Sequence, residues 1–492
     1  MILVKSVGSG SWTVYHRSLG GDFVIELNNT NALLPGGLAW EVSASTFKLN
    51  QGNYDNSGEQ YVAYLFAHDA AADGLIQCGS FTSPATVTLG WEPQFVMVRK
   101  YNAVGNWIML DTMRGMDVSA NGRHLYANLT TAETPDAAQR VIPTATGFIF
   151  PTQNTNGPFI YMAIRRPNKP PTTGTQVFMP TVYTGTNVDN RLVNTTIAPD
   201  MVMVRQRNTT TVAGMVVGSR LLGQPYLRTG TAATEVSDPD SLDQQLVSAV
   251  EYGTAFSAMN GFWVGNDAAA LLNQNTTANN HVALAFKRAP GFFDVVTYTG
   301  DDNTVRGITH KLGVAPQLLL CKSMSSTEDW FAQFQIETST LTLRLNLNSA
   351  VLHTGSSHLT ASSFLAWNNS SLLQNNALNQ SYVAYLFASL PGVSKVGSYT
   401  GNGTSQTIDC GFTTGARFVL IKRTDATGNW FVWDSARGIN TGTDPRLALN
   451  ALAAEVTSVD SIDPDNSGFA VNQGENDNIN VSTATYHYLA IA

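Results

Sequence analysis

One short pattern recurs five times along the 492 residues, at intervals of about 100 residues. Four apolar residues are followed by a basic residue in every copy. The copies are Met1 to Lys5, Phe95 to Arg99, Met201 to Arg205, Leu318 to Lys322 and Phe418 to Lys422. Self-similarity at a fixed period marks repeat architectures, so this feature limits the possible folds more than any single motif does.

Four further blocks follow in the same order within the copies. A tryptophan stands seven or eight residues after the base in four copies, at positions 12, 107, 330 and 430, and the third copy has Met215 instead. Phenylalanine, usually after glycine, opens a strand at positions 47, 148, 262, 364 and 469. An apolar, largely aromatic segment closes each copy, at residues 61–66, 159–164, 281–286, 382–387 and 486–491. A Tyr-Thr-Gly turn occurs at 183–185, 298–300 and 399–401.

These blocks favour short antiparallel strands, because they are rich in Val, Phe, Tyr and Thr and are separated by Gly, Asn, Asp and Pro clusters. We therefore predict an all-β fold, a tandem array of about five β-sandwich, jelly-roll-like modules of roughly 100 residues. The predicted modules are 1–78, 79–175, 176–290, 291–392 and 393–492. Prolines at the joints, at Pro170, Pro290 and Pro391, predict a rod or an arc rather than loose beads.

The first copy is incomplete, because it begins at the strand that ends in the base and has no Tyr-Thr-Gly turn before it. An incomplete sandwich exposes an unpaired strand edge, to which another strand can be added. We expect the edge at Ile2 to Lys5 to be covered by another chain or another segment.

Composition excludes several classes of protein. Charged residues make up only 13% of the chain, about half the usual fraction, and the net charge is −8. No basic run suits nucleic acid, and no apolar stretch approaches the length of a membrane helix. The three cysteines, Cys78, Cys321 and Cys410, are widely spaced and predict buried reduced thiols rather than a disulfide framework or a zinc site. A neutral polar surface suits a protein that packs against copies of itself or against other chains.

Three stretches, residues 397–403, 422–430 and 433–438, resemble a module repeated in tail-fibre and other virion proteins of tailed phages, marine phages in particular. Residues 310–316, followed by an apolar strand and a lysine, are similar to the same module. The resemblance covers essentially the whole chain and is weakest in the third copy, which lacks the tryptophan. It implies a structural role in the virion and supplies no catalytic residues.

The recurring bases are candidates for a ligand site or for structural pairs. Asp111 lies twelve residues after Arg99, and Asp434 twelve after Lys422, so we expect each pair to meet across the sheet. The motif from Asp111 to Gly115 recurs from Asp434 to Gly438 and predicts a turn fixed by a local Asp–Arg ion pair. Neither motif offers a second acid or a nucleophile–base pair, which catalysis would need.

The remaining candidate sites have structural interpretations. The tryptophans are expected in the core, and the alternative is a row of stacking platforms for glycans. Asp463 to Gly468 resembles the start of a calcium loop, but Gly474 stands where the bidentate Glu belongs. The eight histidines form no metal spacing and no triad. We predict no catalytic, cofactor-binding or metal-binding residues and no cofactor, and the binding residues stay unassigned.

The sequence thus predicts a phage virion structural protein rather than an enzyme, and most specifically a tail fibre or tail-associated adhesin that contacts the host surface through repeated β modules. Expected partners are other virion proteins and further copies of the chain, with a host surface glycan as a candidate ligand and no nucleic acid or membrane insertion. Assembly in the host cytoplasm is expected. One alternative is a capsid-associated fibre or decoration protein. Another is a polysaccharide depolymerase, which would need paired carboxylates about 5–10 Å apart.

Overall fold

The computed structural model spans residues 1–492. It describes this range except for residues 9, 36–38, 51–57, 72, 119–122, 136–140, 152–155, 168, 189, 211–213, 224, 236–242, 246–251, 266–271, 274–279, 371–372 and 473–477. The chain forms two compact units, residues 1–167 and residues 168–492. We number the sequence copies as repeats 1 to 5, so that repeats 1 and 2 make up the first unit and repeats 3 to 5 the second.

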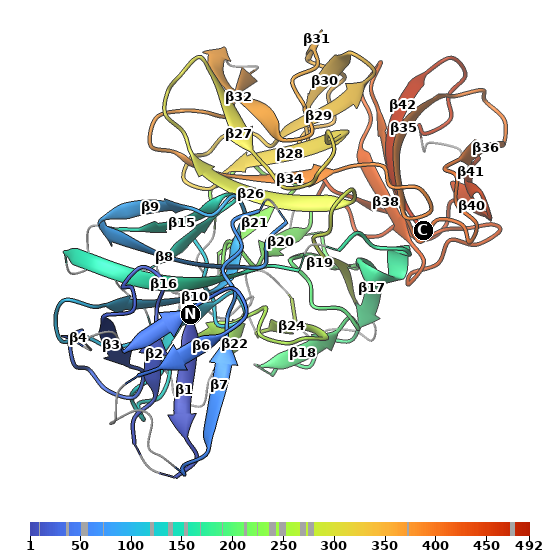
Figure 1. The fold of residues 1–492 in the computed structure, drawn as a ribbon. Coiled ribbons are helices and arrows are strands. Elements are labelled where there is room, and N and C mark those ends of the chain that lie inside the picture. Colours follow the sequence, from blue (N-terminus) through green and yellow to red (C-terminus); the bar gives the residue numbers. More distant parts are fainter. Residues whose placement is uncertain are drawn as a thin grey trace. The chain divides into compact units, whose positions relative to one another are not determined.

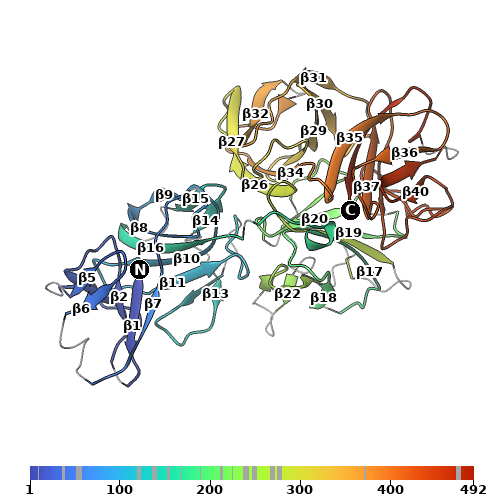
Figure 2. The ribbon, with the colours of Figure 1, turned by 45° about the vertical axis from the view of Figure 1, so that its right-hand side comes forward.

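Antiparallel strands make up both units (Figures 1 and 2). The single helical segment in the described ranges is a 3-10 turn, η1 (Gly174–Gln176). The predicted all-β fold with several separate sheets is confirmed. In the described part of the chain, no helix has the length and apolar character needed to cross a membrane.

The described residues of the first unit form strands β1 to β16. Those of repeat 1 are β1 (Ile2–Ser6), β2 (Thr13–Tyr15), β3 (Phe23–Glu26), β4 (Leu34–Pro35), β5 (Trp40–Val42), β6 (Phe47–Leu49) and β7 (Tyr61–Leu65). Those of repeat 2 are β8 (Ile76–Ser83), β9 (Ala85–Thr88), β10 (Pro93–Lys100), β11 (Ile108–Asp111), β12 (Arg123–Tyr126), β13 (Thr134–Pro135), β14 (Ile142–Thr144), β15 (Gly147–Phe150) and β16 (Gly157–Arg165). Strand β8 begins before the predicted module boundary at residue 78 and pairs with β16 of repeat 2.

The second unit contains the other strands. Those of repeat 3 are β17 (Phe178–Tyr183), β18 (Arg191–Asn194), β19 (Met201–Gln206), β20 (Val216–Ser219), β21 (Tyr226–Arg228), β22 (Asp243–Gln245), β23 (Tyr252–Thr254), β24 (Gly261–Val264) and β25 (His281–Phe286). Those of repeat 4 are β26 (Phe293–Thr299), β27 (Val305–Thr309), β28 (Leu318–Ser323), β29 (Phe331–Ile336), β30 (Ser339–Arg344), β31 (His353–Ser356), β32 (Ser363–Ser370), β33 (Leu373–Gln374) and β34 (Ser381–Phe387). Those of repeat 5 are β35 (Ser394–Thr400), β36 (Gln406–Asp409), β37 (Phe418–Arg423), β38 (Trp430–Asp434), β39 (Leu447–Ala448), β40 (Ile462–Asp465), β41 (Gly468–Val471) and β42 (Thr485–Ile491).

One strand order recurs in the main sheets of all the repeats. The strand that carries the recurring base, here called the base strand, lies at the centre; the base strands are β1, β10, β19, β28 and β37. On one side it pairs with the strand that follows the tryptophan position. On the other side it pairs with the last strand of the repeat, here called the closing strand; these are β7, β16, β25, β34 and β42. In repeats 2 to 5 the closing strand also pairs with the first strand of its repeat, here called the opening strand; these are β8, β17, β26 and β35.

Each main sheet packs against a smaller sheet, as repeat 5 illustrates. Its core joins Val419 and Tyr488 of the main sheet to Ile408 and Phe469 of the small sheet β36-β41-β40. Alternate residues of each strand reach this core, as the two-residue period of a pleated strand requires. The strands therefore form a sandwich with one buried layer in each repeat.

The tyrosine of the Tyr-Thr-Gly turn has the same role in three repeats. The hydroxyl groups of Tyr183, Tyr298 and Tyr399 donate to the carbonyl oxygens of Leu272, Asn375 and Ile479 at 2.6, 2.7 and 2.6 Å. Each ring also stacks on the ring opposite it on the closing strand, with centroids 4.8 to 5.2 Å apart. A buried hydroxyl needs such a partner, so the motif fixes the opening strand to the rest of the sandwich.

Repeat 1 differs from the others because it has no opening strand. Strand β1 is not an edge, since it pairs with β2 on one side and with β7 on the other. The segment Ile2 to Lys5 is therefore covered by another segment, as expected, and the covering strand β7 belongs to the same repeat. Within the described residues the open edge belongs to β7, which pairs with β1 alone.

Candidate functional site at the junctions between repeats

The recurring bases lie where one repeat meets another. Arg99 of repeat 2 donates to the carbonyl oxygens of Asn29 and Asn31 in repeat 1, at 3.3 and 2.5 Å. Arg205 of repeat 3 likewise donates to carbonyl oxygens of repeat 5, those of Ala448, Ala451 and Ala453. Asn29 and Asn31 follow β3, and Ala448, Ala451 and Ala453 lie in or after β39. These two arginines therefore bind the loop of the neighbouring repeat rather than a ligand.

The tryptophans occupy the same junctions. The indole Nε1 of Trp107 donates to the carbonyl oxygen of Glu26 at 2.8 Å, from repeat 2 to repeat 1. Trp330 donates to Arg228 at 2.8 Å, from repeat 4 to repeat 3, and Trp430 to Arg344 at 3.1 Å, from repeat 5 to repeat 4. All three rings are at most 1% exposed. The predicted core position is thus a position between repeats, and the burial leaves these rings no face for a glycan.

A main-chain hydrogen bond completes each junction. In every case the residue two positions after the base accepts a hydrogen bond from the loop of the neighbouring repeat. The bonds are Leu33 to Tyr101, Glu235 to Met324, Val351 to Thr424 and Glu455 to Arg207, at 2.7 to 3.0 Å. Four junctions therefore share one geometry: repeat 1 with 2, 3 with 4, 4 with 5, and 5 with 3.

The last of these junctions closes the second unit on itself. Repeat 4 contacts repeat 3, repeat 5 contacts repeat 4, and repeat 3 contacts repeat 5, so the three sheets form a ring (Figure 2). Five phenylalanines from the ends of opening, closing and base strands meet in this unit with ring centroids 4.7 to 6.0 Å apart: Phe178, Phe286, Phe293, Phe387 and Phe418. The prediction that the proline joints produce a rod or an arc is wrong for residues 168–492, because the contacts are cyclic.

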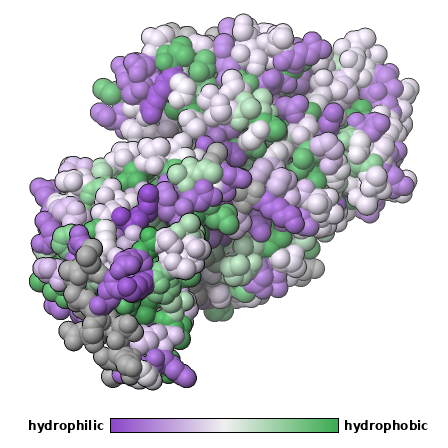
Figure 3. Space-filling view, in the orientation of Figure 1, coloured by the Kyte–Doolittle hydropathy of each residue, from purple (hydrophilic) through white to green (hydrophobic). Residues whose placement is uncertain are grey.

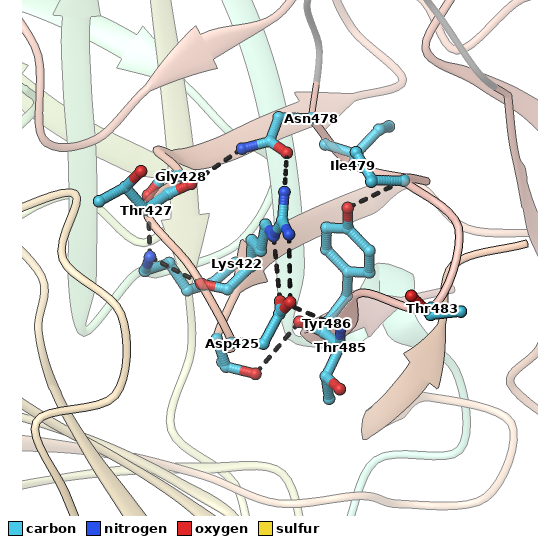
Figure 4. A network of polar contacts seen from close by, with 12 residues as sticks. Lys422, Asp425, Thr427, Gly428, Asn478, Ile479, Thr483, Thr485 and Tyr486 are labelled. Atoms are coloured by element: carbon cyan, nitrogen blue, oxygen red, sulfur yellow. Dashed lines mark hydrogen bonds and ion pairs between the residues drawn. The ribbon is translucent and has the colours of Figure 1, made fainter. Parts of the chain in front are cut away.

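Figure 4 shows the base of repeat 5 within its junction. The Nζ of Lys422 donates to the carbonyl oxygens of Arg423 and Gly428 at 2.7 and 2.8 Å, and to that of Asn348 in repeat 4 at 3.4 Å. It also lies 5.9 Å from the ring centroid of Trp430, within the range of a cation–π contact. The ammonium group therefore fixes the conformation of the loop after β37, and this loop contacts the neighbouring repeat 4.

A second layer of the same network fixes that loop from the other side. Arg423 pairs with Asp425 at 3.0 Å and donates to the side-chain oxygen of Asn478, whose amide donates to the carbonyl oxygen of Thr427 (Figure 4). Asp425 in turn accepts from the main-chain N–H of Thr485 at the start of β42. The loop is thereby tied to the closing strand as well as to the base strand.

Burial lowers the pKa values of four recurring bases. It lowers the pKa of Lys322 and of Lys422 to about 8, and that of Arg99 and of Arg205 to about 10. Desolvation is the largest cause in all four cases, because their partners are mainly neutral carbonyl groups. A perturbed pKa is a common sign of an active site, but here the terminal nitrogens of these side chains already donate to main-chain carbonyl groups.

The predicted pairing of the bases with aspartates is wrong. Asp111 lies opposite Phe95, and Asp434 opposite Phe418, four residues away from Arg99 and Lys422. The local turn, in contrast, is confirmed. Arg114 pairs with Asp111, and Arg437 pairs with Asp434 at 2.6 Å with both side chains fully buried.

One recurring side chain was missed from the sequence. The side-chain oxygens of Asn28, Asn128, Asn346 and Asn450 accept from the main-chain N–H of the tryptophan in their own repeat, at 2.8 to 2.9 Å. Thr229 does the same for Met215 at 2.8 Å. Asn28, Asn346 and Asn450 lie in the segments that bind the neighbouring base. The signal was an asparagine 16 to 21 residues after each tryptophan, a spacing that varies because the intervening loops differ in length.

The other candidates have ordinary partners. Cys78, Cys321 and Cys410 are buried free thiols, as predicted. Asp465 accepts from the N–H and hydroxyl of Ser467, and Asp463 accepts from Asn472, while Gly474 lies outside the described residues. No group of three or more His, Cys, Asp or Glu side chains is placed to hold a metal ion in the described ranges.

The fold and its junctions define a class of protein, an all-β repeat protein whose repeats bind one another through a shared base and tryptophan. Within this class the chain belongs to the DUF7483 family, described as a domain of unknown function, which it matches over residues 1–167 and 173–492. These two segments coincide closely with the two compact units. No curated protein matches the chain.

Proposed function

We propose that this chain is a structural component of a phage virion, and most specifically a tail fibre or tail-associated adhesin. The resemblance of residues 397–403, 422–430 and 433–438 to modules of such proteins supports the proposal. The low content of charged residues supports it too, because a neutral polar surface suits packing among many copies.

The observation that carries the proposal is the use made of the recurring side chains. Three of the four recurring tryptophans are buried between repeats, and Arg99, Arg205 and Lys422 donate across junctions to main-chain carbonyls. Because these contacts recur from one junction to the next, they make the repeats a rigid scaffold. A scaffold of this kind presents loops at fixed spacing, which suits a structural or adhesive role better than catalysis at one site.

In this role the chain assembles with other virion proteins and with further copies of itself, and a host surface glycan is the candidate ligand. Many weak contacts from repeated loops and copies would add through multivalency. Avidity can exceed the affinity of a single contact by about 10² to 10⁴, so no deep pocket is required.

The test is to locate the chain on intact particles. Antibodies raised against the purified protein are bound to particles and imaged by electron microscopy. Labelling of the tail or its fibres is the expected result, whereas labelling over the capsid would favour a decoration protein instead. Absence of the protein from purified particles would overturn the proposal. Incubation of the purified protein with host surface polysaccharide tests the enzymatic alternative, because a depolymerase would release cleavage products.

A further inference from the structure

The open edge of β7 has a paired counterpart elsewhere in the chain. Residues 61–66 and 382–387 have the same sequence, Tyr-Val-Ala-Tyr-Leu-Phe. In repeat 4 this segment lies in β34, between the base strand β28 and the opening strand β26. Val383, Ala384, Tyr385 and Leu386 are at most 1% exposed there. In repeat 1 the same residues lie at the surface, with Val62, Tyr64 and Leu65 exposed by 43, 49 and 64%.

The tryptophan junction of repeat 1 is also unfilled. The ring centroids of Trp12 and Tyr64 lie 5.8 Å apart, much as those of Trp330 and Tyr385 lie 6.2 Å apart, so the Trp12 ring has the position that its counterpart has in repeat 4. Trp12 is nevertheless partly exposed, and within the described residues its indole N–H donates to no carbonyl group of another repeat. Val7 lies two residues after the base and is 64% exposed. The residues at this position in the other repeats lie at junctions, where their carbonyl oxygens accept a hydrogen bond from a neighbouring loop. Figure 3 shows hydrophobic side chains reaching the surface of this unit, at the lower left.

We infer that the first unit is a three-repeat ring lacking one member, and that its place is taken by one further repeat of this kind followed by an opening strand. The second unit shows the completed arrangement, in which every tryptophan position faces a neighbouring loop. Two segments of the chain match the same family, and the first of them is the shorter by about half. The inference does not depend on a role in the virion.

A second copy of this chain cannot supply the missing parts without unfolding. Its four opening strands are each paired with their own closing strands, and repeats 3 to 5 already fill one another's junctions. The missing repeat and its opening strand are therefore supplied from outside residues 1–492.

The residue opposite Ala63 specifies the incoming strand. Where the closing strand has a tyrosine at this position, the opening strand has glycine: Gly79 faces Tyr161, and Gly397 faces Tyr488. Where the closing strand has alanine, the opening strand has a β-branched residue: Thr181 faces Ala283, and Val296 faces Ala384. Since repeat 1 has alanine here, the partner strand carries Val, Ile or Thr at this position.

A synthetic peptide tests the strand. Residues 290–301, which include β26, are added to the whole chain, and amide hydrogen exchange is followed by mass spectrometry. Saturating peptide should slow exchange of the β7 amides that face away from β1 by about tenfold or more, because these amides gain partners. The matched peptide with Val296→Gly should bind about tenfold more weakly, because it leaves a hole over Ala63. Leu65→Lys should abolish this protection. The control is Val188→Lys in the second unit, at a residue that is 63% exposed, and it should leave the protection unchanged.

A fusion tests the whole partner. Residues 176–317 are placed before Met1, because Ile2 pairs with Leu65 as Leu319 pairs with Leu386, so that Met1 takes the place of Leu318. Far-UV circular dichroism verifies that the added part is folded. The fusion should protect β7 and the Trp12 segment together.

Unchanged exchange of β7 with both the peptide and a folded fusion would overturn the inference. So would a dimer of the 1–492 chain that Leu65→Lys dissociates in light scattering, because a second copy would then occupy the edge.

Discussion

The indole Nε1 of Trp430 donates to the main-chain carbonyl oxygen of Arg344 at 3.1 Å, across the junction between repeats 5 and 4. The Trp430 ring also stacks on Phe334 of repeat 4, with centroids 5.9 Å apart. One side chain therefore provides both a hydrogen bond and apolar contact between two sandwiches. The same relationship joins Trp107 to Glu26 and Trp330 to Arg228.

We expect Trp430→Phe to destabilise the second unit by about 1–3 kcal/mol, because the buried carbonyl of Arg344 loses its donor. The measurement is urea unfolding followed by circular dichroism. Trp12→Phe is the matched control, since this tryptophan is partly exposed and donates to no neighbouring repeat among the described residues. Its effect should be within about 0.5 kcal/mol. Equal losses for the two variants would show that the junction contributes nothing specific.

The buried ion pair of repeat 5 should be far more sensitive than its equivalent in repeat 2. Arg437 and Asp434 are fully buried, so Arg437→Met leaves an uncompensated carboxylate and should cost about 3–5 kcal/mol. Arg114 and Asp111 are 27 and 18% exposed, and Arg114→Met should cost about 1 kcal/mol or less. Thermal unfolding of the two variants compares them directly, and a larger loss for Arg114→Met would contradict the ranking by burial.

His487 should make the second unit sensitive to acid. Burial lowers its pKa to about 4, so the unfolded chain binds a proton near pH 6.5 while the folded chain does not. Stability from this group is complete above pH 6.5 and is lost as the pH falls to 4, by at most about 3 kcal/mol. His487→Gln should flatten the unfolding free energy between pH 4 and 6.5. A parallel decline in both proteins would assign the acid sensitivity to other groups.

Much of this fold could be predicted, because strand periodicity and turn residues are local signals. The base strands, the closing strands and the Tyr-Thr-Gly turns all lie where the aligned blocks placed them. The junctions could not be predicted, because the partners of Arg205 are about 250 residues away in the chain and are main-chain carbonyls, which leave no side-chain signature. The ring follows from those junctions, so it was missed as well.

The edge of repeat 1 was misplaced for a related reason. The sequence shows that an opening strand is absent, but not which strand that absence exposes. The answer depends on the spatial order, in which the closing strand β7 separates the base strand β1 from the missing position. The exposed edge can therefore be located only when the order of the strands in the sheet is known.

The last prediction concerns how opening and closing strands are matched in size. Gly397 faces Tyr488, and a Cβ at residue 397 would lie 2.7 Å from the Tyr488 hydroxyl oxygen. Gly397→Val should therefore destabilise the second unit by about 1–3 kcal/mol through overpacking. Tyr488→Ala should cost about 3–5 kcal/mol through the cavity that it leaves.

The double variant reproduces the pair of Val296 with Ala384 in repeat 4, which is at most 3% exposed on both strands. Because valine fills part of the space that tyrosine vacates, the double variant should be more stable than the summed single losses, with a coupling of about 1 kcal/mol or more. A double-mutant cycle in urea measures this coupling. Simple additivity would mean that the two strands do not sense each other's side chains, and would remove the basis for assigning a β-branched residue opposite Ala63.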